Sequence, residues 1–181
     1  VGQPLGQLHL GGGSPTFLSD AQLRELMTML RRSFSFRSTG EYSIEIDPRT
    51  VDVTRLDTFR ELGFNQLSFG VQDFDPVVQK AVHRVQPAEQ VVDLIEAARA
   101  RGFESINVDL IYGLPRQSPG SFERTLAQVT RLRPNRIALY AYAHLPQRFK
   151  AQRRIAMVEL PSAVAKAAML SCSLQAFDEA G

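Results

Sequence analysis

The sequence is poor in cysteine: Cys172 is the only one among 181 residues. A single cysteine excludes an internal disulfide framework, a paired-cysteine zinc site and a complete iron–sulfur site within this chain. Cys172 lies in a helical pattern rich in Ala, Leu and Ser, so we expect a buried, unreactive thiol. We therefore expect no metal site made by this chain alone.

Several other features are missing. The formal net charge of +2 is too small to indicate a nucleic-acid partner. No uninterrupted apolar run spans a bilayer, and the first residues lack the basic and apolar regions of a signal peptide. We expect a cytoplasmic protein with no membrane partner. The chain also lacks a starting Met, so we expect that an N-terminal part is missing, although a processed chain would look the same.

Strand-length apolar runs recur along the chain, each bounded by Gly, Pro or Asp. They predict strands over residues 7–10, 42–46, 66–71, 106–112 and 136–142. The segments between them have helical spacing of apolar residues. They predict helices over residues 19–34, 53–62, 87–101, 118–132 and 161–180, with residues 147–159 a loop containing some helix.

Strands that alternate with helices of this length indicate parallel pairing with right-handed connections. About five such βα units fit a partial barrel or a doubly wound sheet, and periodicity alone does not separate the two. In both architectures ligands bind at the carboxyl ends of the strands. Polar residues at those ends are therefore the first candidates for a site.

The strand ends carry unusual residues, each with a structural alternative. The glycines at residues 11–13 allow a ligand to approach the backbone, or form a plain turn. Glu45 in an apolar strand binds a ligand amine or hydroxyl, or lies on a solvated edge. Gln72 has no local structural role, which favours ligand binding. Asp109 contacts a ligand or makes a buried hydrogen bond.

A structural role explains other polar residues more simply. Asp73 is expected to cap the helix that follows it. From the residues alone, Arg84 is expected to be solvated. His144 is structural or catalytic with equal weight. The basic residues that follow the last strand form a solvated face or bind an anionic substrate: Arg148, Lys150, Arg153 and Arg154.

Five motifs occur in order: Gly-Gly-Gly-Ser-Pro-Thr at 11–16, Ile-Glu-Ile-Asp-Pro at 44–48, Leu-Ser-Phe-Gly-Val-Gln-Asp-Phe at 67–74, Asn-Val-Asp-Leu-Ile-Tyr-Gly-Leu-Pro at 107–115 and Tyr-Ala-His-Leu-Pro at 142–146. Together they resemble the radical S-adenosylmethionine family of oxygen-independent coproporphyrinogen III oxidases over nearly the whole chain. A near relative, the haem chaperones of the same superfamily, differs at the third and fifth motifs. Ser14 departs from the family's usual Thr but keeps the hydroxyl.

The resemblance implies an α/β fold, a parallel partial (β/α) barrel of the radical SAM type, truncated to about five βα units. Residues 1–181 would form one partial barrel domain that lacks the N-terminal cluster-binding segment and the C-terminal region. The family's chemistry uses a [4Fe–4S] cluster, whose cysteines would precede residue 1, and a 5'-deoxyadenosyl radical. It removes two propionate carboxyls of coproporphyrinogen III, giving the vinyls of protoporphyrinogen IX in haem biosynthesis.

The resemblance also implies partners and assembly. The substrate would be coproporphyrinogen III, and an external donor would supply electrons. The complete protein would be a monomer without nucleic-acid partners. The isolated chain would be inactive, and its exposed sheet edge would favour self-association.

Matched by motif, Gly12, Glu45 and Ala143 would surround the S-adenosylmethionine bound to the cluster. A second S-adenosylmethionine would contact Gly13, Ser14, Gln72, Arg84 and Asp109. We add the hypothesis that Arg148, Arg153 and Arg154 hold the substrate propionates, and we assign no catalytic residue. Two alternatives stay open: a haem-binding chaperone, and a structural fragment that binds no ligand.

Overall fold

The computed structural model describes residues 2–181. Its strands are β1 (Gln3–Leu10), β2 (Phe34–Ile46), β3 (Gln66–Gln72), β4 (Ser105–Tyr112) and β5 (Arg136–Ala141). Its α-helices are α1 (Asp20–Ser33), α2 (Arg55–Glu61), α3 (Pro76–Ala81), α4 (Ala88–Ala100), α5 (Pro119–Leu132) and α6 (Ala163–Ala180). The strands form a 5-stranded sheet in the order β1-β2-β3-β4-β5, and β2 pairs in parallel with both β1 and β3. The predicted alternation of strands and helices is confirmed.

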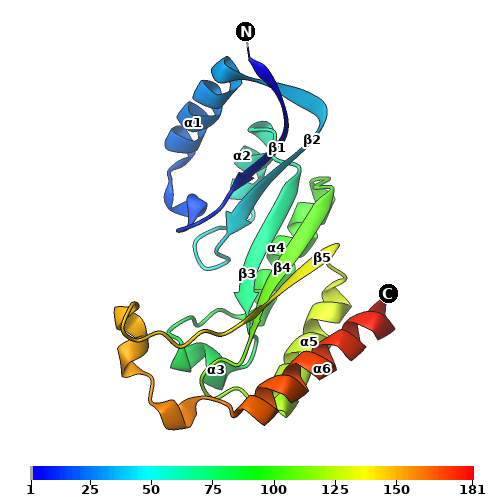
Figure 1. Cartoon of the computed structure of the whole chain (residues 1–181). Helices are drawn as coiled ribbons and strands as arrows, with labels where there is room; N and C mark the ends of the chain where they lie inside the picture. Colours follow the sequence, from blue (N-terminus) through cyan, green and yellow to red (C-terminus); the bar gives the residue numbers. More distant parts are fainter. Residues whose placement is uncertain (1) are drawn as a thin grey trace. The chain divides into compact units, whose positions relative to one another are not determined.

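The chain divides into two compact units, and strands β3 and β4 contribute to both. The first unit contains residues 2–70 with Glu89–Val108. In it α1 lies beside the β1–β2 pair (Figure 1) and buries Leu23 and Met27. The core of this unit is built from large apolar side chains that are fully buried: Ile44, Ile46, Leu56, Phe59, Phe64, Leu67, Phe69, Leu94 and Ile95.

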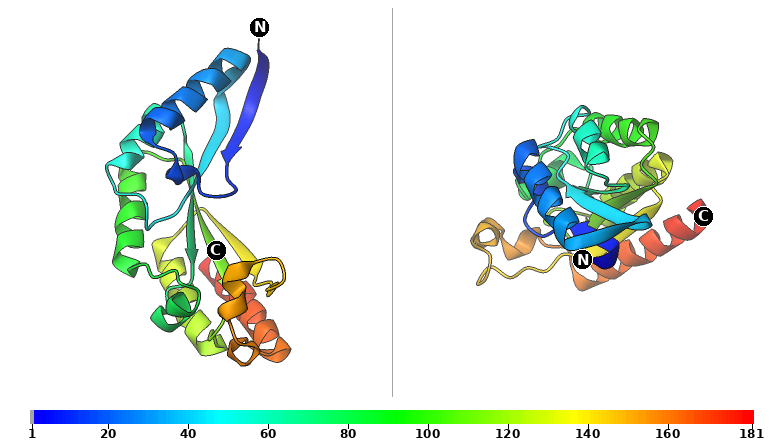
Figure 2. Two further views of the ribbon diagram at one scale, coloured as in Figure 1. Left: turned by 90° about the vertical axis from the view of Figure 1, so that its left-hand side faces the viewer. Right: turned by 90° about the horizontal axis from the view of Figure 1, so that it is seen from above.

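The second unit contains Val71–Ala88 and Asp109–Gly181. Helices α5 and α6 pack side by side in it (Figure 2), and Phe122, Leu126 and Val129 of α5 are buried. After β5 the chain forms two short 3-10 helices, Lys150–Arg154 and Met157–Glu159. This matches the expected loop with some helix.

The start of β2 differs from the prediction. The strand was expected from residue 42, but it begins at Phe34, directly after α1, and its first residues pair with Gln3 to Leu5. The pairing slips between Leu5 and Gln7. Most side chains over residues 34–39 are exposed, and the apolar alternation of Phe34 and Phe36 ends at Arg37, which is too short to predict a strand.

Helix α6 departs from the expectation that no segment could cross a membrane. By length and composition alone, Met157–Ala180 is long and apolar enough to do so. Its apolar residues, many of them Ala, are interrupted by Ser, Lys and Gln and form no single uninterrupted run, which is why the search for such a run missed it. One helix of this kind is weak evidence for a membrane, because helices of soluble proteins pass the same test.

Candidate functional site

The glycine loop, residues 11–14, joins the end of β1 to the first helical turn. Gly12 has a φ of 99°, a conformation that favours glycine, and open space surrounds the position of its missing side chain. A Cβ at Gly11 would lie 2.8 Å from Glu45 Oε1. Glycine at this position therefore leaves room for the carboxylate of β2 to lie against the loop.

Glu45 is the acid that the family resemblance groups with Gly12 around one ligand. Its side chain is 38% exposed, between the buried Ile44 and Ile46. His9 Nε2 lies 3.3 Å from Glu45 Oε1, and His9 Nδ1 lies 2.8 Å from Ser43 Oγ. Because a carboxylate only accepts hydrogen bonds, the Nε2 atom carries the proton in this arrangement.

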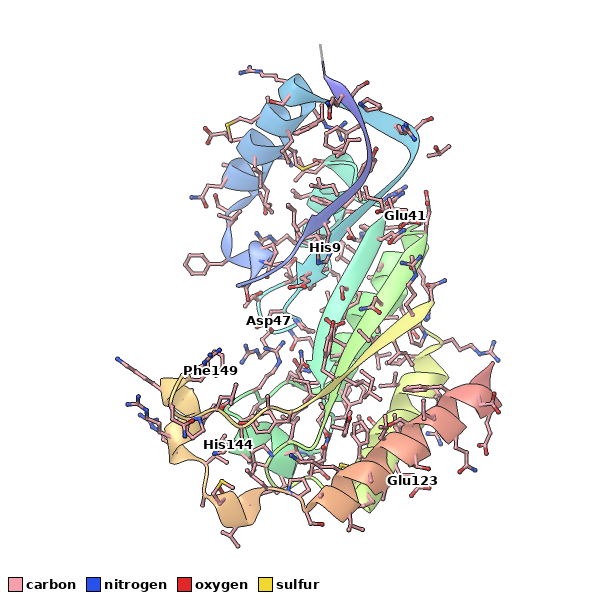
Figure 3. All side chains as sticks on the ribbon, viewed as in Figure 1. His9, Glu41, Asp47, Glu123, His144 and Phe149 are labelled. Carbon is pink, nitrogen blue, oxygen red and sulfur yellow. The ribbon has the colours of Figure 1, made fainter. Side chains whose placement is uncertain are left out.

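His9 is a member of this cluster that the sequence analysis did not single out. Figure 3 shows it on β1. Its partnership with β2 follows from the strand register, which sets His9 opposite Ser43. Register between strands so far apart in sequence leaves no local signal, so sequence reasoning could not find the contact.

The second unit contains a cavity of about 340 Å³, which we call the Gln72–Arg84 cavity. It brings together two predicted site residues, Gln72 from the end of β3 and Arg84 from the segment after α3. Arg84 is half-buried, so the expectation of a solvated arginine is wrong. The remaining lining is mixed, with polar His83, Tyr142 and Gln152 beside apolar Ala81, Val82, Ile111, Leu114, Ala151 and Ile155.

Tyr142 contributes a polar group to this cavity that the sequence analysis did not assign to a ligand. Its hydroxyl is buried and has no hydrogen-bond partner within residues 2–181. Burial raises the pKa of Tyr142, so the phenol remains protonated and able to donate at neutral pH. His144 Nδ1 is also buried without a partner in the same part of the chain. Figure 3 shows His144 and Phe149 on the segment that follows β5.

Asp73 is not the helix cap that the sequence predicted. The cap of α3 is Asp75, whose carboxylate accepts hydrogen bonds from the backbone of Val77 and Val78. Asp73 is instead only 1% exposed and accepts hydrogen bonds from Gln117 and Thr125. Burial raises the pKa of Asp73, while these donors act in the opposite direction.

Gly13 and Ser14 belong to the glycine loop of the first unit, and the remaining predicted residues lie in the second unit but do not line the cavity. Asp109 is a half-buried residue of β4. Ala143 is exposed, and its carbonyl accepts a hydrogen bond of 3.1 Å from Gln152 Nε2. The arginines proposed for substrate, Arg148, Arg153 and Arg154, are all exposed, and Arg153 Nε donates to Pro146 O at 3.0 Å.

Cys172 on α6 is half-buried, where the sequence predicted a buried thiol. Burial, followed by the nearby charges of Glu123 and Glu179, raises the pKa of the thiol, which makes it a poor nucleophile. Residues 2–181 contain no group of three or more His, Cys, Asp or Glu side chains that could hold a metal ion. The described residues of this chain therefore do not fit a metal cluster.

Comparison with known proteins gives the family. The model of the radical SAM superfamily matches residues 2–129. The oxygen-independent coproporphyrinogen III oxidase of Pseudomonas aeruginosa is 51% identical over 181 residues, which is 99% of this chain and 39% of that protein. The Escherichia coli protein of the same name is 47% identical over 100% of this chain and 40% of its own length. The chain thus spans about two fifths of these relatives.

Solved structures agree with the sequence comparison. The coproporphyrinogen III oxidase of Escherichia coli, described as a radical SAM enzyme, has a TM-score of 0.95 at 47% identity and covers 98% of this chain and 41% of its own. The archaeal Elp3 of Methanocaldococcus infernus, at 13% identity, shares only the fold, with a TM-score of 0.72 over 92% of this chain and 44% of its own. The expected fold class, a partial parallel (β/α) barrel of the radical SAM type, is confirmed. The chain belongs to the radical SAM superfamily.

Proposed function

We propose that this chain is part of an oxygen-independent coproporphyrinogen III oxidase of haem biosynthesis. The complete enzyme would be an oxidoreductase that removes two propionate carboxyls of coproporphyrinogen III and leaves vinyls, giving protoporphyrinogen IX. Identity of about half over 99% of the chain to a protein of that name supports the proposal. The observation in the structure that carries it is the carboxylate of Glu45 lying against the glycine loop at the strand ends.

The glycine loop and Glu45 fit the methionyl part of S-adenosylmethionine. The open space at Gly12 and Gly13 lets a ligand approach the backbone closely, and the partly exposed Glu45 can accept hydrogen bonds from its ammonium group. His9 donates to the same carboxylate and holds its orientation. Ala143 is assigned to this ligand by motif alone. With the [4Fe–4S] cluster of the complete protein, bound S-adenosylmethionine would supply the radical chemistry.

The Gln72–Arg84 cavity fits a second S-adenosylmethionine. Its volume of about 340 Å³ lies within the usual range for a site that binds a small molecule. The guanidinium of Arg84 would pair with the ligand carboxylate, and the amide of Gln72 would bind a polar group. Gly13, Ser14 and Asp109 are assigned to this second molecule by motif.

The exposed arginines after β5 suit the substrate. Arg148, Arg153 and Arg154 present fixed positive charges to solvent, and the propionates of coproporphyrinogen III are carboxylates. We further propose that the complete protein acts in the cytoplasm as a monomer and takes electrons from an external donor.

The test is anaerobic turnover of coproporphyrinogen III by the full-length protein with S-adenosylmethionine and a reductant. We expect protoporphyrinogen IX together with 5'-deoxyadenosine. Glu45→Gln should reduce turnover at least tenfold, because a neutral amide binds an ammonium group less strongly. Glu41→Gln, on the same strand, is the matched control and should leave turnover unchanged. Haem binding without release of 5'-deoxyadenosine would reject the oxidase in favour of a haem chaperone.

A further inference from the structure

The turn at the end of β3 is strained at the residue that lines the cavity. Gln72 has a φ of 68°, in the left-handed region that non-glycine residues seldom adopt. The backbone N–H of Asp73 donates to Val71 O at 2.9 Å, which closes a three-residue γ-turn around Gln72. Turns of this kind with positive φ are rare and strained. Such strain persists only where neighbouring groups fix the backbone, and it clusters at functional sites.

Buried amides hold both carbonyls that flank this turn. Gln86 Nε2 donates to Val71 O at 2.6 Å, and Gln79 Nε2 donates to Asp73 O at 2.9 Å. Gln79 Oε1 in turn accepts from the backbone N–H of Gln86 at 3.1 Å. Both glutamine side chains belong to residues that are at most 5% exposed, so no solvent competes for these bonds.

The carboxylate of Asp73 fixes the turn from its other side. It accepts hydrogen bonds from Thr125 Oγ1 at 2.7 Å, Gln117 Nε2 at 2.5 Å and the backbone N–H of Asp75 at 2.6 Å. Gln117 is itself held, because its Oε1 atom accepts from the backbone N–H of Gly113 at 2.5 Å. The amide of Gln117 therefore cannot rotate without losing a second buried bond.

We propose that Asp73 is a positioning residue that acts through Gln72. With Gln79, Gln86, Gln117 and Thr125, which together we call the Asp73 clamp, it holds the strained turn that directs Gln72 to the cavity. The inference rests on the proposed function only in taking Gln72 as a ligand contact. Because the Gln72 side chain is already fixed before the ligand arrives, binding does not have to offset the entropy cost of ordering it.

The clamp also defines what the cavity binds. Gln72 offers an amide in one fixed place, and Arg84 lines the same cavity with a guanidinium. The cavity should select a small molecule that carries a carboxylate and, at a set distance from it, a polar group for the amide. S-adenosylmethionine has both groups and is the probe we would use.

The first experiment reads the turn itself. In a crystal structure of the full-length Asp73→Asn variant, the Asn amide faces the Gln117 amide, donor against donor. We expect the bond from residue 73 N to Val71 O to be lost and Gln72 to leave the left-handed region. An unchanged turn would overturn the proposal, whatever the protein binds.

The second experiment is a double-mutant cycle on binding of labelled S-adenosylmethionine, measured anaerobically by equilibrium dialysis with the full-length holoprotein. Gln72→Ala should weaken one class of site about tenfold, the loss expected for one hydrogen bond. Asp73→Asn should weaken the same class by a similar factor. The double variant should bind no worse than Gln72→Ala alone, because Asp73 acts only through Gln72.

A matched control and a second variant keep the outcome decisive. Asp75→Asn changes a carboxylate two residues away, retains the helix cap and should leave affinity unchanged. If Asp73→Asn does not fold, Thr125→Val enters the cycle in its place. If the losses of affinity caused by Gln72→Ala and by the clamp variant multiply in the double variant, the positioning role is overturned. If Gln72→Ala leaves the affinity for S-adenosylmethionine unchanged, the proposed ligand contact is wrong. The crystal structure of Asp73→Asn then still tests whether Asp73 holds the turn.

Discussion

Replacing Thr125 by Val removes one hydroxyl from a fully buried position and keeps the shape of the side chain. Thr125 is 1% exposed on α5. Its Oγ1 atom donates to Asp73 Oδ1 at 2.7 Å and accepts from the backbone N–H of Phe74 at 3.3 Å. After the change, a buried carboxylate loses a donor and a buried N–H loses its acceptor. The local stability around the β3–α3 connection should fall.

The size of this loss follows from the two bonds. A hydrogen bond to a charged group contributes about 1.5–3 kcal/mol. Leaving the backbone N–H of Phe74 without its acceptor adds roughly 1 kcal/mol, the lower end of the usual range, because the original bond is long. Together they predict a loss of about 3 kcal/mol in the free energy of local opening. Since 1.4 kcal/mol is a factor of ten, amide hydrogens around Thr125 should exchange roughly a hundredfold faster.

The assay is native-state hydrogen exchange of peptides that cover α3 and α5 in the full-length protein. Thr130→Val is the matched control, because Thr130 lies on the same helix, is only half-buried, and donates a long hydrogen bond of 3.3 Å to Ala127 O of its own helix. The control should change the free energy of opening by less than about 0.5 kcal/mol. If Thr125→Val behaves like the control, the argument for a tightly bonded Asp73 is refuted.

The same variant should depend on pH in a defined direction. Burial raises the pKa of Asp73 above the ordinary aspartate value of about 3.9. The stability that its protonated form provides is therefore present below about pH 4 and is lost as the pH rises through the folded pKa. Thr125 stabilises the ionised carboxylate, so its removal raises that pKa further. The deficit of Thr125→Val should be larger at about pH 8 than at about pH 4.

Three other substitutions test the sites. Gly11→Ala should weaken binding of S-adenosylmethionine about tenfold or more, because its Cβ would lie 2.8 Å from the Glu45 carboxylate and displace it. Tyr142→Phe should leave thermal stability unchanged or raise it by about 1 kcal/mol, since the buried hydroxyl has no partner within residues 2–181, and should weaken ligand binding about tenfold. Replacing both Arg153 and Arg154 by Ala should raise the KM for coproporphyrinogen III about tenfold without destabilising the protein.

Each of these has a result that would contradict it. Gly6→Ala, on the neighbouring strand β1, meets nothing nearer than 4.0 Å and is the control for Gly11→Ala, so equal affinity of the two variants would dismiss the steric argument. A clear drop in melting temperature for Tyr142→Phe would mean that its hydroxyl is satisfied. An unchanged KM in the double arginine variant would reject these arginines as propionate contacts.

The sequence predicted the alternation of strands and helices because each βα unit carries its own signal, whereas the choice of a partial barrel over a doubly wound sheet came from the family resemblance and not from periodicity. Ser19 and Ser118 mark helix starts by local hydrogen bonds, and both cap the predicted helices. The first half of β2 was not predicted because only Phe34 and Phe36 are apolar among residues 34–39, and most side chains of this segment are exposed. Edge pairing leaves little pattern, since burial on one face is what produces alternation.

The candidate site was only partly predictable. Gln72 and Arg84 were named by motif, and the structure places both on one cavity. Asp73 was misread because two aspartates precede α3 and either could cap it by sequence. What separates them is burial of Asp73 against Gln117, 44 residues later in the chain. A contact of that range depends on tertiary packing, which local patterns do not record.

The left-handed turn at Gln72 has a consequence for protein engineering. Glycine adopts this backbone at little cost, so an effort to raise the melting temperature would favour Gln72→Gly, with a gain of up to about 1 kcal/mol. The same change would remove the amide that we propose contacts the ligand. A substitution that stabilises the protein but lowers its activity indicates a position where stability and activity oppose each other. A stability-guided redesign of this fold should therefore keep position 72 fixed.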